Sequence, residues 1–436
     1  MNDLTQGKPS RVMIAFAFPI ALGNIFQLFY SLADTRVVGS TLGMTALAAV
    51  GATTSISTLF IGFLNGLTNG FAILVAREYG AGKKNGVRRL SAASLALGFL
   101  TALLLTVFCV VFLPFLLRIL NVPSELETEA ISYIRIILFG LFATFAYNGC
   151  AAILRAVGDT TAALVFLICA SFLNIILDLV LILVFHMGVA GAALATVVSQ
   201  CAAAGASFVY MVKRYEMFRF TLEDFRVRKE DAKDLYASGF SMAIMMSLVF
   251  FGTLALQCAI NTFGNDTIVA HTAARKITEF YMLPFSVLGA TMSTYCGQNM
   301  GALRKDRIRE GLWQALCIAW AWSAGMVVLS YTAAPVLIRL VTGISQDMII
   351  RTASSYLKFD TLFYFVTAAI ALIRNALQGM GEHVVPVYSS LIELVGKVVI
   401  ACFLTPVFAY WGIIVAEPIV WCLMVIPLVV RIRKLL

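Results

Sequence analysis

Long apolar runs separated by short polar segments make up almost the whole chain. Twelve runs are roughly 18 to 25 residues long, the length at which an α-helix crosses a hydrocarbon core of about 30 Å. Strands of a membrane barrel would instead alternate in polarity over about ten residues. The pattern therefore predicts an all-α polytopic membrane protein with twelve transmembrane helices. The expected spans are 13–34, 53–76, 91–113, 131–153, 162–185, 190–212, 237–261, 277–298, 312–334, 353–375, 385–407 and 411–430.

Composition agrees with this pattern. Hydrophobic residues make up 61% of the chain and charged residues 13%, and the mean hydropathy is +0.91. A soluble domain is about half apolar and a quarter charged. The first apolar run is long, contains Asp34 and lacks a small-residue cleavage pattern, so we expect it to be retained as a helix and not removed as a signal sequence.

The basic residues follow the expected topology. The net charge of +9 could suggest a nucleic-acid partner. With a cytoplasmic N-terminus and twelve spans, however, 23 of the 32 lysines and arginines fall in cytoplasmic segments. The positive-inside rule explains such a distribution. We therefore expect no nucleic-acid partner, and a multi-pass protein of the cell (inner) membrane with both termini in the cytoplasm.

Cysteine and histidine give no sign of a metal centre or a disulfide. The nine cysteines lie inside predicted spans and form no C-x-x-C pair. His186, His271 and His383 are far apart and lack the spacing of metal ligands. We expect no metal site apart from a possible Na⁺ site formed by oxygen ligands.

The sequence also contains an internal repeat. LGMTALAAVGATTSI from Leu42 resembles FGNDTIVAHTAARKI from Phe263, a shift of 221 residues, and REYGAGKKNGVRR from Arg77 matches QNMGALRKDRIRE from Gln298 at the same shift. Two further pairs of short segments match at shifts of 221 and 223. Each half then holds six helices, and an even number gives both halves the same orientation in the membrane.

Parallel six-helix repeats of this kind pack about a pseudo-two-fold axis along the membrane normal and leave a cleft between two lobes. We expect an N-lobe over residues 1–212 and a C-lobe over residues 235–436. The polar, charged segment 213–234 between them is predicted to be a cytoplasmic linker.

A few polar residues lie inside the predicted spans of the first half. An ionisable residue in a membrane span suggests a functional site. Asp34 lies toward the end of the first span, and Asn174 and Asp178 are spaced i, i+4 on one face of the fifth. Tyr133 and Thr196 can add a hydroxyl each. Alternatively, Asp34 only marks the helix end and Asn174 only bonds a neighbouring helix.

The second half does not repeat these acids. At the repeat shifts, Asp34 corresponds to Ala255 and Asp178 to Ala401. A requirement of the repeated fold should occur in both halves, so this asymmetry favours a cation site. The second half has acids of its own whose roles the sequence leaves open, with Arg374 and Lys397 as possible partners. These acids are Glu279, Asp360, Glu393 and Glu417.

Several segments together resemble one transporter family. They are FPIALGNIFQLFYSLADTRVVGSTLG, the Gly-Ala loops at Gly80 and Gly301, LRAVGD, and NIILDLVLI followed by MGVAGAALAT. In this order, with twelve spans and the duplication, they resemble the multidrug and toxic compound extrusion (MATE) family, close to its DinF-type branch. The resemblance covers essentially the whole chain.

The resemblance implies a V-shaped two-lobe antiporter that expels organic, often cationic or aromatic, compounds in exchange for H⁺ or Na⁺. It implies a small-molecule substrate, the lipid bilayer as surroundings, no cofactor and a monomer. The NorM-like branch binds sodium through C-lobe acids, but SMAIMMSLVFFGTLAL in the seventh span contains none. By the resemblance, the first-helix bend falls at Pro19 and the coupling cation is bound by Asp34, Tyr133, Asn174, Asp178 and Thr196.

Other functions fit the sequence less well. The GAGKKNG segment, residues 80–86, lacks the G-x-x-x-x-G-K-[ST] pattern of a nucleotide-binding loop. An intramembrane aspartyl protease would need its two acids on adjacent helices and would not predict the repeat, so we expect no enzyme. The remaining alternative is a flippase or exporter of a lipid-linked or polysaccharide substrate, in which Arg135 and Lys397 could meet a phosphate.

Overall fold

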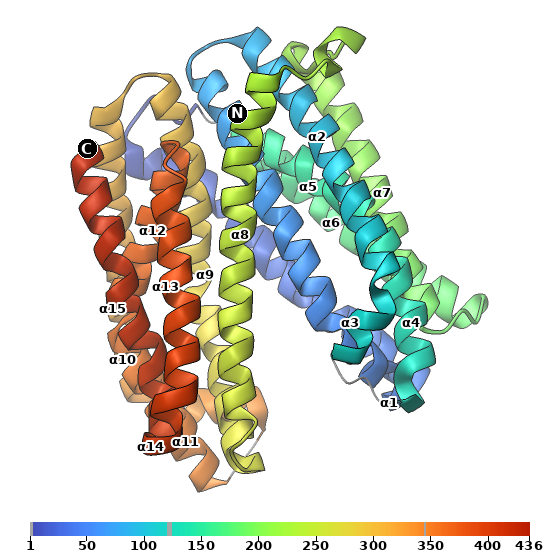
Figure 1. The fold of residues 1–436 in the computed structure, drawn as a ribbon, viewed down its shortest axis with the longest axis vertical. Helices are drawn as coiled ribbons and strands as arrows, with labels where there is room; N and C mark the ends of the chain where they lie inside the picture. Colours follow the sequence, from blue (N-terminus) through green and yellow to red (C-terminus); the bar gives the residue numbers. More distant parts are fainter. Residues whose placement is uncertain (1–2, 120–123, 344–345) are drawn as a thin grey trace. The chain divides into compact units, whose positions relative to one another are not determined.

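The computed structural model describes residues 3–119, 124–343 and 346–436. Within these ranges the chain is helical, with short turns and no β-strand (Figure 1). Its contacts group it into two compact units. The first is built mainly from Phe18–Ala243, and the second from Leu4–Ala17 together with Ile244–Leu436.

The first unit contains most of the long first helix and the elements that follow it, ending within α8. In chain order these are α1 (Pro9–Gly80), α2 (Lys84–Val111), α3 (Leu113–Ile119), α4 (Ser124–Phe139), α5 (Leu141–Ala156), α6 (Thr160–Leu179), the π-turn η1 (Val180–Val184), α7 (Val189–Arg214), the 3₁₀ turns η2 (Glu216–Phe218) and η3 (Leu222–Phe225), and α8 (Lys229–Ile260).

The second unit begins with the start of α1 and continues from within α8 to the end of the chain. Its further elements are α9 (Asn265–Gly301), α10 (Lys305–Thr342), α11 (Asp347–Leu362), α12 (Tyr364–Gly379), α13 (Val384–Val399), the π-turn η4 (Ile400–Leu404), α14 (Thr405–Phe408) and α15 (Tyr410–Leu435).

All twelve expected spans fall on helices. Eight described helices are long and apolar enough to cross a membrane, and two further spans form as bent pairs, α4 with α5 (43°) and α11 with α12 (53°). The single 72-residue α1 carries the first two expected spans, with a break at Gly43 (φ 86°, ψ −177°). α9 covers the expected span 277–298 but is too polar to count among the eight.

The course of α1 decides between the two interpretations of Asp34. The sequence left open that Asp34 merely marks the end of the first span. In the structure α1 continues beyond Asp34 without a break as far as Gly43. The carboxylate therefore projects from the body of a helix, so the helix-end interpretation is wrong.

Irregular backbone recurs at nearly the repeat distance found in the sequence. The bend after Phe139 recurs after Leu362, and the π-turn at Val180 recurs at Ile400. Positive φ angles recur as well, in three pairs: Gly82 (71°) with Leu303 (58°), Gly158 (89°) with Gly381 (87°), and His186 (51°) with Ala409 (50°). The duplication predicted from short sequence matches is therefore also visible in where the helices break.

Close helix packing within the first unit depends on glycine. A Cβ atom on Gly66 would lie 2.6 Å from the Ala243 Cα, and one on Gly70 would lie 2.5 Å from the Ser238 carbonyl oxygen. The Ser238 hydroxyl donates to the Gly70 carbonyl at 2.7 Å. Small residues let two backbones approach closely, as is common between helices in membranes.

The predicted linker 213–234 packs onto the first unit. Phe218 is fully buried. Arg88 and Arg89 of α2 form ion pairs at 3.0 Å with Asp224 and Asp231. The capping-box bonds between Thr221 and Asp224 order the same turn. The linker is therefore a folded, docked segment and not a free tether.

Candidate cation site

The predicted cation ligands come from four helices of the first unit. Asp34 lies on α1, Tyr133 on α4, Asn174 with Asp178 on α6, and Thr196 on α7. Their spacing of four residues places Asn174 and Asp178 on one face of α6. Both side chains are buried, with relative exposures of 1% and 0%. Asp34 is partly exposed.

Asn174 is the centre of the hydrogen-bond network. With its amide oriented to satisfy its neighbours, its nitrogen donates to Asp178 Oδ2 and to the Tyr30 hydroxyl, both at 2.9 Å. Its oxygen accepts from the backbone N–H of Thr196 at 3.0 Å. The amide therefore joins α1, α6 and α7.

The two carboxyl groups are in contact with each other. The Asp34 and Asp178 side chains lie within hydrogen-bonding reach of each other, and Tyr133 lies close enough to interact electrostatically with both. One oxygen of each carboxyl, Oδ1, has no hydrogen-bond partner among the described residues. Two carboxylates this close repel unless a proton or a metal cation lies between them. Carboxyl, amide and hydroxyl oxygens are suitable hard ligands for Na⁺.

Tyr30 was missed by the sequence analysis. It precedes Asp34 by four residues on α1, so both side chains project from the same face. Tyr30 contacts Asn174 and lies close to the Thr196 side chain. The i, i+4 spacing that identified Asn174 beside Asp178 could have identified Tyr30 beside Asp34.

A small cavity lies on the same side of α1, closer to its N-terminus. Its volume is about 110 Å³, and α1, α5 and α6 line it. Pro19, Gly23 and Gln27 border it, and Arg155 closes it from α5 while donating to Asn69 at 3.3 Å. Gly23, Gln27, Tyr30 and Asp34 follow a helical stripe with spacings of four, three and four residues. The cavity and the cation ligands therefore share one face of α1.

The π-turn η1 begins two residues after Asp178, and such turns are frequent at functional sites. The second unit, however, has its own π-turn η4 at the equivalent place, although no aspartate precedes it there. The π-turn is therefore a feature of the repeated fold and does not by itself mark the cation site.

A second buried cluster of charges lies in the second unit. Lys397 is 3% exposed and pairs with Glu393 at 2.9 Å and with Glu417 at 3.2 Å. Arg275 pairs with the other oxygen of Glu417 at 2.9 Å, and Arg374 lies 3.8 Å from Glu393. The predicted pairing of Arg374 and Lys397 with acids is confirmed, whereas Arg275 was missed. Most of these charges compensate one another, as buried ions require.

The remaining acids of the second unit differ in their surroundings. Asp360 of α11 is fully buried, and neither of its carboxyl oxygens has a hydrogen bond of good geometry among the described residues. Glu279 of α9 is exposed. The cluster therefore contains one acid, Asp360, that the ion pairs do not include.

Comparison with known proteins relates these features to a family. The protein-family model described as MatE matches residues 19–180 and 241–403, one segment in each repeat. The chain is 27% identical over 368 residues to the probable multidrug resistance protein YpnP of Bacillus subtilis, covering 83% of this chain and 80% of the relative. It is 23% identical over 278 residues to the multidrug export protein MepA of Staphylococcus aureus, covering 62% and 60%.

Solved structures agree with these relatives. A crystal structure of MATE in complex with MaL6 superposes with a TM-score of 0.89 at 25% identity, covering 99% of this chain and 98% of the other. A MOP superfamily transporter from Pyrococcus furiosus superposes with a TM-score of 0.88 at 25% identity, with the same coverage. The chain therefore belongs to the MATE family of multidrug transporters and is a membrane transporter, not an enzyme.

Proposed function

We propose that this transporter exports organic cations and aromatic compounds by antiport against H⁺ or Na⁺, and that the coupling ion binds between Asp34 and Asp178. The close approach of the Asp34 and Asp178 carboxyl groups is the observation that carries this proposal. Multidrug resistance and export proteins among the relatives support the substrate class.

Electrostatics explains why the ion would alter the helices. Without a cation or proton between them, two carboxylates in a poorly solvated site repel and push α1 away from α6. With one bound, α1 is held against α6 and α7 through the Tyr30–Asn174–Thr196 contacts. The ion therefore favours one arrangement of α1 over another, as a coupling ion must.

The cavity and the cation ligands lie on the same face of α1, so a movement of α1 could connect ion binding to substrate binding. The cavity lies on the stripe that ends at Asp34, and Pro19 borders it. Proline cannot donate to the carbonyl one turn earlier, which makes this part of α1 easier to bend. The helix also passes from the second unit to the first between Ala17 and Phe18, directly before the proline. Bending there would change the cavity when the ion binds or leaves.

The membrane potential supplies part of the driving force. One charge that crosses 100 mV gains about 2.3 kcal/mol, and the concentration gradient of the ion adds to this. The proposal includes a cell-membrane location, cytoplasmic termini and a monomeric transporter. The positive-inside distribution of lysine and arginine supports the orientation.

The flippase alternative is less well supported. It needs basic side chains that are free to meet a phosphate. Lys397, one of the two candidates, is held by Glu393 and Glu417 in the second unit. Arg135, the other candidate, shares a surface cavity with Glu127, whose negative charge disfavours a phosphate there.

Reconstituted vesicles test the proposal. Export of a fluorescent organic cation is measured while a pH gradient and a sodium gradient are imposed separately. We expect one of the two gradients to drive export. Asp34→Asn and Asp178→Asn should each abolish this export, because an amide has no negative charge to bind the cation and does not take up or release a proton. The matched control is Glu223→Gln, an exposed linker carboxylate, which should export normally. Normal gradient-driven export by both aspartate variants would show that the pair is structural.

A further inference from the structure

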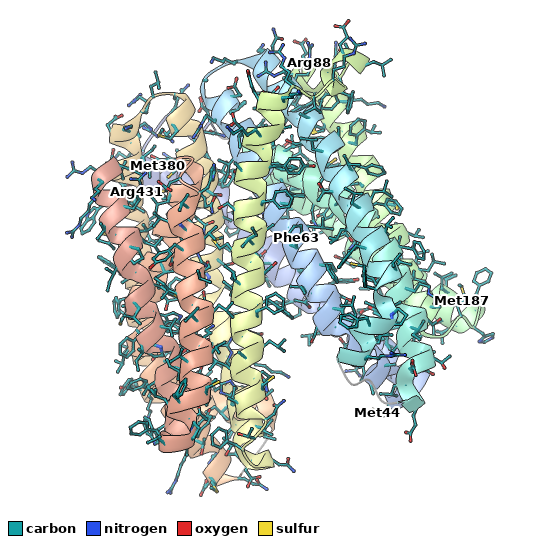
Figure 2. All side chains as sticks on the ribbon, in the orientation of Figure 1. Met44, Phe63, Arg88, Met187, Met380 and Arg431 are labelled. Carbon is teal, nitrogen blue, oxygen red and sulfur yellow. The ribbon has the colours of Figure 1, made fainter. Side chains whose placement is uncertain are left out.

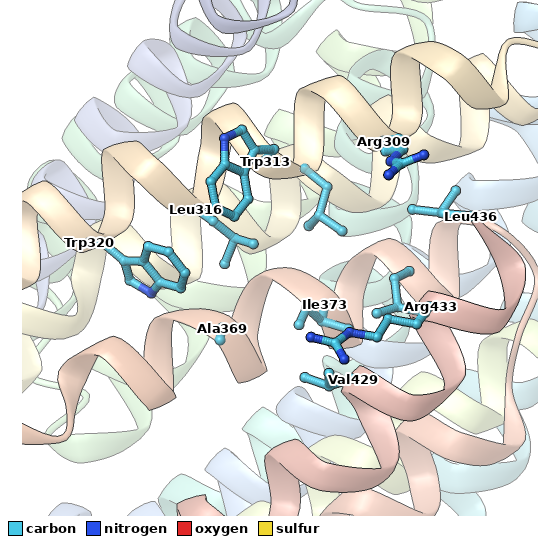
Figure 3. A pocket seen from close by; sticks show the side chains of 11 residues that line it. Arg309, Trp313, Leu316, Trp320, Ala369, Ile373, Val429, Arg433 and Leu436 are labelled. Atoms are coloured by element: carbon cyan, nitrogen blue, oxygen red, sulfur yellow. The ribbon is translucent and has the colours of Figure 1, made fainter.

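A groove on the second unit is separate from both charged clusters. Its volume is about 690 Å³, within the range of small-molecule sites, and it lies between α10 on one side and α12 with α15 on the other (Figure 3). Nine of its eleven lining residues are apolar, and the other two are Arg309 and Arg433. No acidic side chain lines it.

The groove has a charged end and an apolar end. Arg309 lies in the second turn of α10 and Arg433 in the last turn of α15. Figure 3 shows Arg309 toward one end and Trp320 at the other, with the Arg433 guanidinium between them beside Ile373 and Val429. The eleven residue-to-residue steps from Arg309 to Trp320 rise about 16 Å along α10. This is close to half of a hydrocarbon core of about 30 Å, and so to the depth of one leaflet.

The two arginines differ from Arg431 and Arg304 at the same helix ends, which form ion pairs. Arg431 pairs with Glu382, and Arg304 pairs with Asp306 at 3.2 Å. Among the residues that the structure describes, neither Arg309 nor Arg433 forms an ion pair. The groove therefore presents two arginines that pair with no acidic side chain, next to an apolar surface that includes Trp313, which is 60% exposed.

We propose that this groove binds one anionic phospholipid of the surrounding bilayer. Arg309 and Arg433 attract the anionic headgroup, since guanidinium groups form strong charge-assisted hydrogen bonds with phosphate oxygens. An acyl chain lies along Leu316 and Ile373 toward Trp320. Basic pockets between transmembrane helices are suited to anionic headgroups.

The positive charge of the groove disfavours occupants other than an anionic lipid. An organic cation would meet two positive charges at the mouth, which disfavours the exported substrates. A zwitterionic lipid brings its own ammonium group, which would lie close to both arginines. The anionic lipid alone matches both the charged mouth and the apolar body.

Tryptophan quenching tests the site in the intact protein. The protein is reconstituted into phosphatidylcholine vesicles that contain a minor fraction of brominated phosphatidylglycerol or, separately, of brominated phosphatidylcholine. Bromine on the acyl chain quenches nearby Trp313 and Trp320. We expect the anionic lipid to occupy the groove roughly tenfold more than its bulk fraction predicts, and so to quench more strongly than the zwitterionic one.

Charge-matched variants provide the control. Arg309→Gln with Arg433→Gln should abolish the difference between the two brominated lipids. Arg304→Gln with Lys434→Gln removes the same charge from the same helix ends but outside the lining, and should preserve it. Equal quenching by both lipids, or a difference that survives in the Arg309/Arg433 variant, would overturn the proposal. A second copy of the chain on this face would protect Trp313 from both lipids and would also overturn it.

Discussion

At the scale of single residues, the candidate site depends on how oxygen atoms from separate helices converge. Asn174 is the only side chain of the cluster with hydrogen bonds to a carboxyl, a phenol and a backbone amide. It fixes Asp178 in the orientation that brings it against Asp34. The two unpartnered carboxyl oxygens then face a cluster that can accept one more positive charge.

Tyr30→Phe tests this network with little change in volume. The variant removes one oxygen and leaves the Asn174 amide with one partner fewer, a loss of about 1 kcal/mol for a neutral hydrogen bond. We expect the ion concentration that gives half-maximal export to rise about fivefold, while the protein folds as before. The measurement is export rate against ion concentration. Tyr388→Phe, at a position 55% exposed, is the control, and an unaltered ion dependence in Tyr30→Phe would remove Tyr30 from the site.

At the scale of elements, the long helix α1 combines three features that other helices have separately. It contains an internal proline, carries one of the two acids of the candidate site and contributes to both compact units. Other long helices contain proline without the acid, as α10 does at Pro335. α1 is therefore the element whose bending would connect ion binding to the rest of the protein.

Pro19→Ala should slow transport without lowering the thermal stability of the protein. Alanine restores the missing hydrogen bond, and proline in a helix interior costs about 3 kcal/mol relative to alanine. We expect the variant to resist thermal unfolding at least as well as the parent but to export at least several-fold more slowly. Thermal stability in detergent and export in vesicles are measured together.

The matched control for Pro19 is Pro335→Ala, which changes an exposed proline inside α10. It should gain stability without losing transport. If Pro19→Ala exports at the parental rate, α1 does not need to bend at this position.

At the scale of the whole molecule, the repeat organises the chain. Helix bends, π-turns and positive φ angles recur at nearly the same shift as the sequence matches. The charged residues do not recur. The first unit has a pair of acids with unused oxygens, and the second has a network of ion pairs around Lys397. The two units therefore share the same backbone arrangement but differ in the charged residues of their interiors.

Topology is tested by accessibility in whole cells. Lys229 lies at the start of α8, and Met44 lies next to the Gly43 break in the first unit, where Figure 2 labels it. Both side chains are exposed. In a background without the nine native cysteines, a cysteine at Lys229 should be shielded from a membrane-impermeant reagent. A cysteine at Met44 should react. The reverse result would invert the proposed orientation.

The sequence by itself determined the helical fold class, the twelve apolar spans, the duplication and five of the six residues of the candidate site. These features depend on local information, because span length follows from bilayer thickness and the i, i+4 spacing fixes which side chains share a helix face. Tyr30 was also within reach of that rule. The sequence could not give the partners of distant residues.

Only the tertiary structure decided those partners. Arg275 and Glu417 are 142 positions apart and meet at 2.9 Å, and Arg309 shares a groove with Arg433 because the start of α10 lies beside the end of α15. Asp34 and Asp178 come into contact in the same way, across two helices. Helix packing sets such meetings, and it depends on the shapes of all the side chains between the helices, which no single stretch of sequence contains.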